Sequence, residues 1–316
     1  MKSKLEIIGI WIVCLLCLFP VLSYGEGQDI LMFLWDGETQ AEIGFRDVLD
    51  EAFIDQNINF TVLNVFKDLD RLEALVAETD EKGFDLIYTY GSRITSKVKE
   101  SYTQTPIVFN IVYDPVRYKI IESWDIKQPN LTGASNSIPL DIQIRKIQEV
   151  FGKGNIGFIY APSDLKALAL KEEMEGILVR EGLDLLGFEY NKNFRFLRSY
   201  LDRVKNQVRC IYMPSGWVIS KDIKRIISQI NRQKIPTCVT SKTYLQERAL
   251  LCISVEYDDV GRMAGELAVQ ILKGVKPADL VVRRPSESDV KLYINSGTLK
   301  RLKIQLSRDL ELTYIK

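Results

Sequence analysis

The chain alternates short apolar runs with longer stretches in which apolar residues recur every three to four positions. Continuous runs of β-branched and aromatic residues indicate strands buried on both faces, and the longer spacing indicates amphipathic helices. A strict β-α alternation of this kind predicts a parallel sheet with right-handed crossovers. In the first part of the chain, the predicted strands are 30–35, 60–65, 85–90 and 106–114, and the predicted helices are 41–56, 69–81 and 95–102.

A second alternating series follows the polar segment 130–133. Its predicted helices are 140–151, 165–181, 196–205 and 222–233, and its predicted strands are 156–160, 185–190, 210–213, 237–240 and 250–255. The clearest helix is 258–273, which ends at Gly274, a residue type suited to a C-terminal cap. Two series of similar size predict an α/β fold with two Rossmann-like lobes, parallel sheets, a hinge and a cleft between the lobes.

The amino terminus does not fit either series. Lys2 and Lys4 precede an apolar stretch at 7–19, and Ser23-Tyr24-Gly25 places small residues where a signal peptidase reads the chain. The apolar stretch is shorter than the roughly 20 residues that a membrane-spanning helix needs. We therefore expect residues 1–25 to be a cleaved signal peptide of a periplasmic or otherwise exported protein, with an uncleaved anchor as the alternative.

Charge and cysteine content narrow the class of protein. The 316 residues carry 42 basic and 42 acidic side chains, without the basic excess that is typical of nucleic-acid binders. Beyond the signal peptide, Cys210, Cys238 and Cys252 each lie in an apolar, strand-like run, and their odd number argues against a disulfide framework. We expect buried thiols, although an oxidising compartment would also allow one disulfide.

The chain contains no histidine. Ser-His and Cys-His nucleophile pairs are therefore excluded, together with the commonest metal ligand. The string at 152–157 matches G-x-G-x-x-G, but a predicted helix precedes it and a strand follows, the reverse of the dinucleotide-binding order. We expect no enzyme activity, no cofactor and no metal. A carboxylate-dependent hydrolase is the alternative, because Asp36, Asp114 and Glu256 follow predicted strands.

Small polar and aromatic residues recur after the carboxyl ends of the predicted strands, where ligands bind in open α/β sheets. Several of these loops precede helices, whose free N–H groups favour anionic ligand groups. The same residue types also suit turns, so both interpretations stay open at any one position. The convergence of several such loops favours a binding site. The candidate ligand-binding residues are Asp36, Ser92, Asp114, Ser135, Asn136, Ser163, Ser215, Trp217 and Glu256.

Several segments match, in chain order, the motifs of one protein family. They are P-I-V-F-N-I-V-Y-D-P at 106–115, N-L-T-G-A-S at 130–135, I-G-F-I-Y-A-P at 156–162 and V-G-R-M-A-G-E-L-A-V-Q-I-L-K-G-V-K-P-A-D at 260–279. On these motifs the chain resembles the tryptophan/tyrosine-type substrate-binding proteins of ABC transporters, which have a type I periplasmic-binding-protein fold. The resemblance implies a receptor that closes two lobes on a small ligand and delivers it to a membrane permease.

The same resemblance implies how the chain is divided and what it binds. The N-terminal lobe is expected to comprise 26–132 and about 256–285, and the C-terminal lobe 133–255 and about 286–316. The resemblance implies a monomer that binds a small amino-acid-like molecule or organic anion. Its protein partner would be an ABC permease, and no nucleic acid is expected to bind. A receptor that signals to a membrane sensor kinase is the alternative.

The chain departs from the family pattern at several positions. Pro214 is followed by Ser215-Gly216, where the family usually has an aspartate two residues after the proline. A carboxylate there would bind the ammonium group of an amino acid, so its absence argues against an ordinary amino-acid ligand. Glu256 stands where aspartate is usual. Trp35 and Trp217 are candidates to sandwich a flat ligand or, alternatively, to pack in the core.

Overall fold

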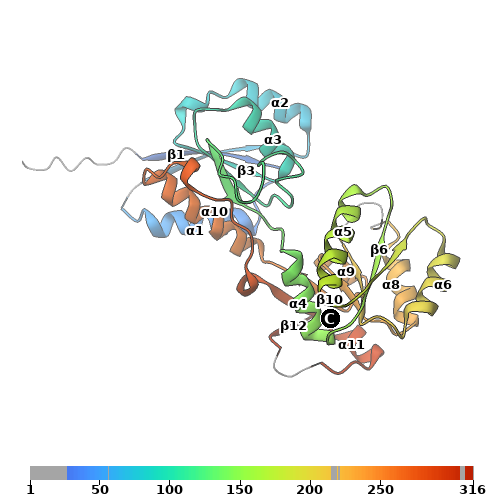
Figure 1. The fold of residues 1–316 in the computed structure, drawn as a ribbon. Coiled ribbons are helices and arrows are strands. Elements are labelled where there is room, and N and C mark those ends of the chain that lie inside the picture. Colours follow the sequence, from blue (N-terminus) through green and yellow to red (C-terminus); the bar gives the residue numbers. More distant parts are fainter. Residues whose placement is uncertain (1–26, 56, 215–218, 220, 307–309, 316) are drawn as a thin grey trace, which may run out of the picture.

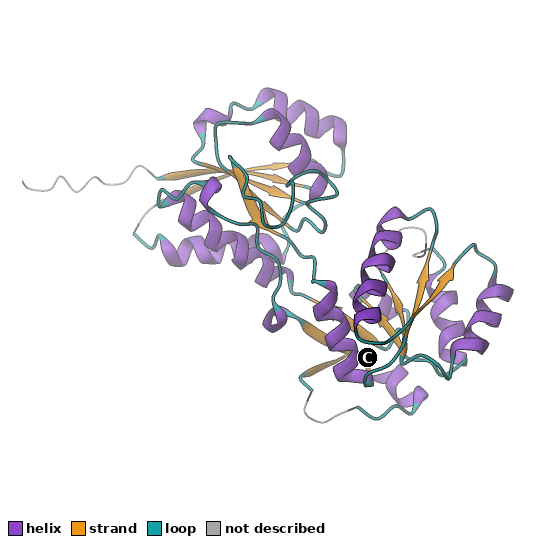
Figure 2. Ribbon diagram, viewed as in Figure 1, coloured by secondary structure: helices purple, strands orange, loops and turns teal. Residues whose placement is uncertain are grey.

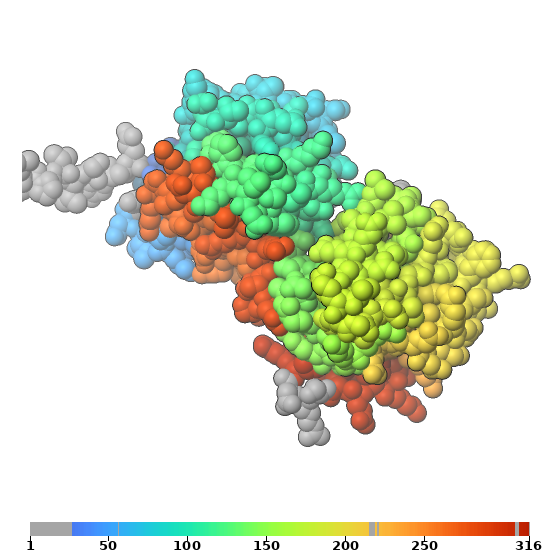
Figure 3. Space-filling model, in the orientation of Figure 1, coloured from blue at the N-terminus to red at the C-terminus, as the bar shows by residue number. Residues whose placement is uncertain are grey.

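Two sheets, each with helices on both faces, make up two lobes of the molecule (Figures 1 and 2). The structure is a computed structural model that describes residues 27–55, 57–214, 219, 221–306 and 310–315. The outline of the molecule narrows where the lobes join (Figure 3). The predicted fold class, two α/β lobes with mostly parallel sheets, is confirmed.

The first sheet is entirely parallel, with the order β2-β1-β3-β4-β5. Its central strands are buried on both faces, which explains their continuous apolar runs. The strands are β1 (Gln28–Leu34), β2 (Ile58–Asn64), β3 (Leu86–Tyr90), β4 (Ile107–Asn110) and β5 (Leu131–Ala134). The helices between them are α1 (Gln40–Ala52), α2 (Leu69–Glu78) and α3 (Ser92–Ser101), with a 3₁₀ turn at Glu81–Gly83.

The second sheet repeats this order and adds two strands, giving β12-β11-β10-β9-β8-β6-β7. The added β11 pairs antiparallel with β10, and β12 pairs parallel with β11. The strands are β6 (Ile156–Tyr160), β7 (Leu185–Glu189), β8 (Cys210–Met213), β9 (Thr237–Val239), β10 (Leu251–Ser254), β11 (Lys291–Asn295) and β12 (Leu312–Ile315). The helices are α4 (Leu140–Phe151), α5 (Leu165–Arg180), α6 (Phe194–Val204), α8 (Ile223–Arg232), α9 (Lys242–Gln246) and α11 (Ser296–Leu302). The sequence pattern did not predict α9, α11, β11 or β12.

Most of the segment 130–133, which the sequence pattern predicts to be a polar connection, belongs to the buried strand β5 (Leu131–Ala134). A Cβ atom on Gly133 would lie 2.3 Å from the carbonyl oxygen of Phe109, so only glycine fits beside β4. The Thr132 hydroxyl is fully buried and donates to the carbonyl of Val281 at 3.3 Å. The first sheet therefore extends to Ala134, past the expected change of lobe after residue 132.

Strand β4 ends earlier than predicted. The strand was expected to run to Asp114, but the backbone turns at Ile111, which has a left-handed φ of 54°. The Asn110 carboxamide supports this turn, because its oxygen accepts the N–H of Ile111 at 2.9 Å. Asp114 and Pro115 lie in the turn that follows, where Asp114 Oδ1 accepts the N–H of Arg117 at 3.1 Å.

Helix α10 (Tyr257–Leu272) ties the two halves of the chain together, because it follows the second sheet but packs on α1 of the first (Figure 1). The two helices touch backbone to backbone. A Cβ on Gly261 would lie 2.1 Å from the Ala41 carbonyl oxygen, and one on Gly44 would lie 2.3 Å from the Asp258 carbonyl oxygen. Helix packing therefore requires glycine at position 261, in the long motif at 260–279.

The chain then passes back to the second lobe. Arg283 forms a bridge with β5, since its N–H donates to the Gly133 carbonyl and its carbonyl accepts the Ser135 N–H, both at 2.9 Å. Two 3₁₀ turns, Pro277–Asp279 and Glu287–Asp289, flank this bridge. The connection after β5 thus runs beside the one before β11, and its Asn136 side chain lies beside Tyr257 at the start of α10.

The cysteines of the second lobe are free and buried. Burial raises the pKa of the Cys252 thiol to about 12, and it raises the pKa of Cys238 as well. Thiols with raised pKa values are poor nucleophiles and act as small apolar side chains. Among the helices that the structure describes, none is both long and apolar enough to cross a membrane.

Candidate functional site

A cavity of about 620 Å³ lies where the two lobes join, within the range of roughly 300–1,000 Å³ that is typical of small-molecule sites. We call it the interlobe cavity. The first lobe contributes the start of α1 and Tyr113, and the second lobe contributes Lys166 and the loops after β9 and β10. Its lining residues are Thr39, Gln40, Tyr113, Asn136, Ile138, Gln143, Lys166, Thr240, Ser241, Lys242, Thr243, Ile253, Ser254, Val255, Glu256 and Tyr257.

Lys166 brings a partly desolvated amine to this cavity. The side chain extends from the first turn of α5, and its Nζ lies 3.2 Å from the centre of the Tyr113 ring of the first lobe. Burial lowers the pKa of Lys166 to about 8, although the charges of Asp164 and Asp114 oppose this shift. Within the described residues, its amine forms no ion pair and so can bind an anionic ligand group.

Lys242 and Glu256 also line the interlobe cavity, where they form an ion pair. The Lys242 amine donates to both carboxylate oxygens of Glu256 at 2.7 and 2.8 Å, and it also lies 4.2 Å from the centre of the Tyr293 ring. Glu256 is the residue before α10, where an anion is favoured by the helix dipole. This part of the lining is therefore polar and nearly neutral, in contrast to the Lys166 side.

Asn136 presents a hydrogen-bond acceptor without a partner. Its Oδ1 atom is buried and accepts no hydrogen bond from any described residue. Its carboxamide also lies beside the Tyr257 hydroxyl and lowers the pKa of that group, although burial dominates and raises it overall. A buried acceptor is normally satisfied, so this oxygen can receive an N–H or O–H from a ligand or water.

A buried polar network holds Thr39 at the rim of the interlobe cavity. Glu42 Oε2 accepts the Thr39 N–H at 2.6 Å and the Thr39 hydroxyl at 2.7 Å. The first of these bonds and the bond from the Glu42 N–H to the Thr39 side chain form a capping box at the start of α1. Glu42 Oε1 accepts the Tyr88 hydroxyl at 2.5 Å, and Asn110 Nδ2 donates to the same hydroxyl at 3.1 Å. Burial first, and the charge of Glu42 second, raise the pKa of Tyr88, so Tyr88 stays a donor.

The second lobe has a neutral counterpart of this network. The buried Tyr212 hydroxyl donates to Gln143 Oε1 at 2.7 Å, and Gln143 Nε2 donates to the Ile138 carbonyl at 2.8 Å. Both Gln143 and Ile138 line the interlobe cavity. These bonds fix the connection after β5 against the second sheet, and so fix Asn136, which lies on it.

Of the candidate residues in the described part of the chain, Asn136 and Glu256 line the interlobe cavity. Ser135 is fully buried beside it, where its hydroxyl accepts the Ser137 N–H at 3.0 Å and donates to the Tyr113 carbonyl at 3.4 Å. Ser135 therefore shapes the connection between the lobes.

The other described candidates do not reach the cavity wall. Asp36 pairs with Lys67 at the surface, Asp114 accepts the Arg117 N–H in a turn, Ser92 begins α3, and Ser163 lies exposed before α5. Ser215 and Trp217 lie outside the described residues. Trp35 is half-buried against the first core, with the Arg93 guanidinium 5.9 Å from its ring centre.

Sequence reasoning missed most of the cavity wall. Thr39 had a readable signal, because Thr39-Gln-Ala-Glu42 is a capping-box sequence just after a predicted strand. Lys166 had none, since a lysine in the first turn of an amphipathic helix is normally exposed. Its burial depends on Tyr113 from the other lobe.

Comparison with known proteins identifies the family. Residues 31–313 match the family described as ABC transporter substrate binding protein. The chain belongs to this family. Substrate-binding proteins of ABC transporters work outside the cytoplasm, where they bind a small molecule and present it to a membrane permease. The family predicted from the sequence motifs is therefore confirmed.

Individual relatives have low sequence identity to this chain, but their alignments cover most of both proteins. The tyrosine-binding protein of Clostridioides difficile (strain R20291) is 24% identical over 281 residues, which cover 88% of this chain and 80% of that protein. A ligand-free, open substrate-binding protein with adhesive properties from Clostridium difficile has a TM-score of 0.80 at 18% identity, covering 92% of this chain and 99% of that one. An L-Trp complex from Streptococcus pneumoniae has a TM-score of 0.65 at 19% identity, covering 92% of this chain and 100% of that one.

Proposed function

We propose that this substrate-binding protein captures a small amino-acid-like molecule or organic anion in the interlobe cavity and delivers it unchanged to its permease. Two cavity-lining groups support the proposal: the Lys166 amine, which forms no ion pair within the described part of the chain, and Asn136 Oδ1, which accepts no hydrogen bond there. A cation and an uncharged acceptor that line one cavity suit a ligand with a carboxylate and an N–H or O–H donor.

The relatives support a ligand of this kind. One is named for tyrosine, and solved structures with bound L-Trp and Leu share the fold. In this chain the acceptor is a neutral carboxamide, and Glu256 is paired with Lys242. Such a wall would bind an ammonium group less strongly than an unpaired carboxylate, so hydroxy acids and acylated amino acids compete with free amino acids as ligands.

We further propose that the lobes close on the ligand about the connections 135–139, 255–256 and 284–290. Ligand binding shifts a two-state equilibrium only by its differential affinity for the two states. Lys166 and Tyr113 come from different lobes, so a ligand that contacts both favours closure. The exported form would begin after a signal peptide at residues 1–25 and act as a monomer.

A thermal-shift screen of residues 26–316 tests the proposal with aromatic amino acids, their N-acetyl derivatives and hydroxy acids. A ligand at 100 times its dissociation constant adds about 2.7 kcal/mol of stability and should raise the melting temperature by about 5 °C. Mass spectrometry should recover each stabilising ligand unchanged. Chemical conversion of a ligand would contradict the proposal and favour a hydrolase.

A further inference from the structure

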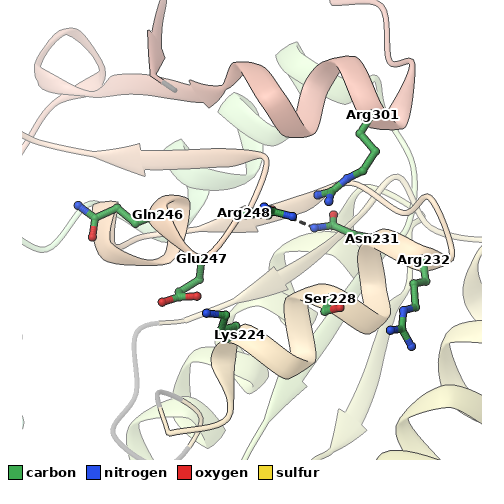
Figure 4. Close-up of a pocket in the computed structure, with 8 residues that line it drawn as sticks. All are labelled: Lys224, Ser228, Asn231, Arg232, Gln246, Glu247, Arg248 and Arg301. Atoms are coloured by element: carbon green, nitrogen blue, oxygen red, sulfur yellow. Dashed lines mark hydrogen bonds between the residues drawn. The ribbon is translucent and has the colours of Figure 1, made fainter.

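A second cavity, of about 600 Å³, lies in the second lobe between α8, the loop after α9 and α11 (Figure 4). It shares no lining residue with the interlobe cavity. We call it the basic pocket, because Lys224 and Arg232 of α8, Arg248 of the loop and Arg301 of α11 line it. Among the lining residues that the structure describes, Glu247 is the single carboxylate.

The cations of the basic pocket lack counter-charges. Within the described residues, none of these four side chains lies within ion-pair distance of a carboxylate, and Arg301 makes only a long 3.4 Å contact with the Thr298 hydroxyl. All four cations are exposed to solvent. Like charges that share one concave surface still repel one another and raise the local concentration of anions. A bound anion would relieve that repulsion.

Several elements of the basic pocket form hydrogen bonds with one atom, the carbonyl oxygen of Arg248. The Arg248 carbonyl accepts a hydrogen bond from Asn231 Nδ2 of α8 at 3.0 Å and another from the Thr298 hydroxyl of α11 at 3.1 Å. Arg248 itself has a left-handed φ of 73°, which this pair of bonds supports. The three arginine-bearing elements are therefore held in a defined arrangement.

Asn231 adds an independent sign of a ligand. It is 8% exposed, and its Oδ1 atom is buried without a hydrogen-bond partner among the described residues. The Arg301 side chain reaches down from α11 toward this carboxamide (Figure 4). An anion that drew the Arg301 guanidinium inward would let one N–H reach Asn231 Oδ1 while the others bind the anion, since a guanidinium has five donors.

We propose that the basic pocket binds a phosphate monoester of a small polyol, such as a sugar phosphate. A phosphate monoester carries a charge of about −1.5 to −2 at neutral pH, and its oxygens match the arginine fork. The pocket volume lies in the range of roughly 300–1,000 Å³ for small-molecule sites, which leaves room for the esterified polyol. Ser228, Gln246 and Glu247 line the remainder and can bind hydroxyl groups.

Isothermal titration calorimetry of residues 26–316 with glucose 6-phosphate, inorganic phosphate and glucose tests the proposal. We expect saturable binding of glucose 6-phosphate, weaker binding of inorganic phosphate and none of glucose. The double variant Arg248→Gln/Arg301→Gln should weaken glucose 6-phosphate binding at least about tenfold, because it removes two charge-assisted donors. The matched control Arg195→Gln/Arg198→Gln removes the same charge from exposed positions on the neighbouring α6 and should leave the affinity unchanged.

Three outcomes would overturn the proposal. One is equal weakening by both double variants, which would indicate a diffuse charge effect. Another is loss of binding in Lys166→Gln, which would place the sugar phosphate in the interlobe cavity. The third is the absence of saturable binding up to about 10 mM glucose 6-phosphate, a concentration that corresponds to very weak affinity. The thermal-shift screen for the interlobe ligand is unaffected by any of them.

Discussion

The two lobes share one strand order but differ in how their paired helices meet. In the first lobe, α1 and α10 touch through backbone atoms at Gly44 and Gly261. In the second, α4 and α5 pack more loosely, and only Ala167, Met174 and Leu178 of the sixteen α5 residues are buried. The tight pair anchors a segment that crosses from one lobe to the other, whereas the loose pair carries Lys166 at the cavity.

The largest expected effect tests this difference in helix packing. Gly261→Ala would place a Cβ 2.1 Å from the Ala41 carbonyl, so α10 must move from α1, and we expect a loss of about 2–3 kcal/mol in the free energy of unfolding. Gly176→Ala on α5 is the control, because its Cβ would meet nothing closer than Arg180 Nη1 at 3.8 Å. That change should be neutral or stabilise by up to about 1 kcal/mol. Urea unfolding of both variants measures the contrast, and equal losses would refute it.

The next effect separates the charged network from the neutral one. Tyr88→Phe removes a donor to the buried Glu42 carboxylate and should cost about 1.5–3 kcal/mol, the range for a hydrogen bond to a charged group. Tyr212→Phe removes a donor to the Gln143 carboxamide and should cost about 1 kcal/mol. Both rings stay in place, so the difference in urea midpoint isolates the hydroxyl contacts. A larger loss for Tyr212→Phe would show that the bond to the Glu42 side chain is not the stronger of the two.

A third prediction concerns pH and the Lys166 side of the interlobe cavity. Because burial lowers the pKa of Lys166 to about 8, the amine is charged below that pH and increasingly neutral above it. The affinity for an anionic ligand should therefore be highest near pH 7, where most of the amine is charged, and about tenfold lower at pH 9. Calorimetry at both pH values measures this change.

Two variants of Lys166 sharpen that test. Lys166→Arg keeps its charge across the range and should bind without the decline at high pH, because arginine does not titrate there. Lys166→Gln should bind weakly at both pH values. A wild-type affinity that stays constant from pH 7 to 9 would show that the Lys166 amine does not contact the ligand.

The smallest expected effect is a change in ligand affinity. It distinguishes candidate binding residues that line the interlobe cavity from candidates that do not. Asn136→Ala removes the unpaired acceptor and should weaken ligand binding about fivefold, as expected for a single neutral hydrogen bond. Asp36→Asn disrupts only a surface pair with Lys67 and should change the affinity less than about twofold and the stability by less than about 1 kcal/mol. An equal loss in both variants would bring Asp36 back as a ligand contact.

The elements themselves were readable because their signals are local. Helix α4, strand β6 and strand β8 have the boundaries that the hydrophobic spacing predicted, since burial on one helix face or on both strand faces leaves a pattern within a few residues. Strand β5 was not readable. Its sequence Leu-Thr-Gly-Ala looks polar, but Thr132 and Gly133 are buried because Val281 and Phe109 pack beside them.

The sequence by itself determined two α/β lobes, the buried cysteines and, through its motifs, the family. Only the tertiary structure decided which polar residues meet, because the cavity forms where the loop after β4, the connection after β5, the start of α5 and the residue before α10 bring Tyr113, Asn136, Lys166 and Glu256 together. Asp36, Ser92 and Ser163 follow the same sequence rule yet do not reach its wall. Sequence patterns record whether a residue is buried, but the neighbour that buries it comes from a distant part of the chain.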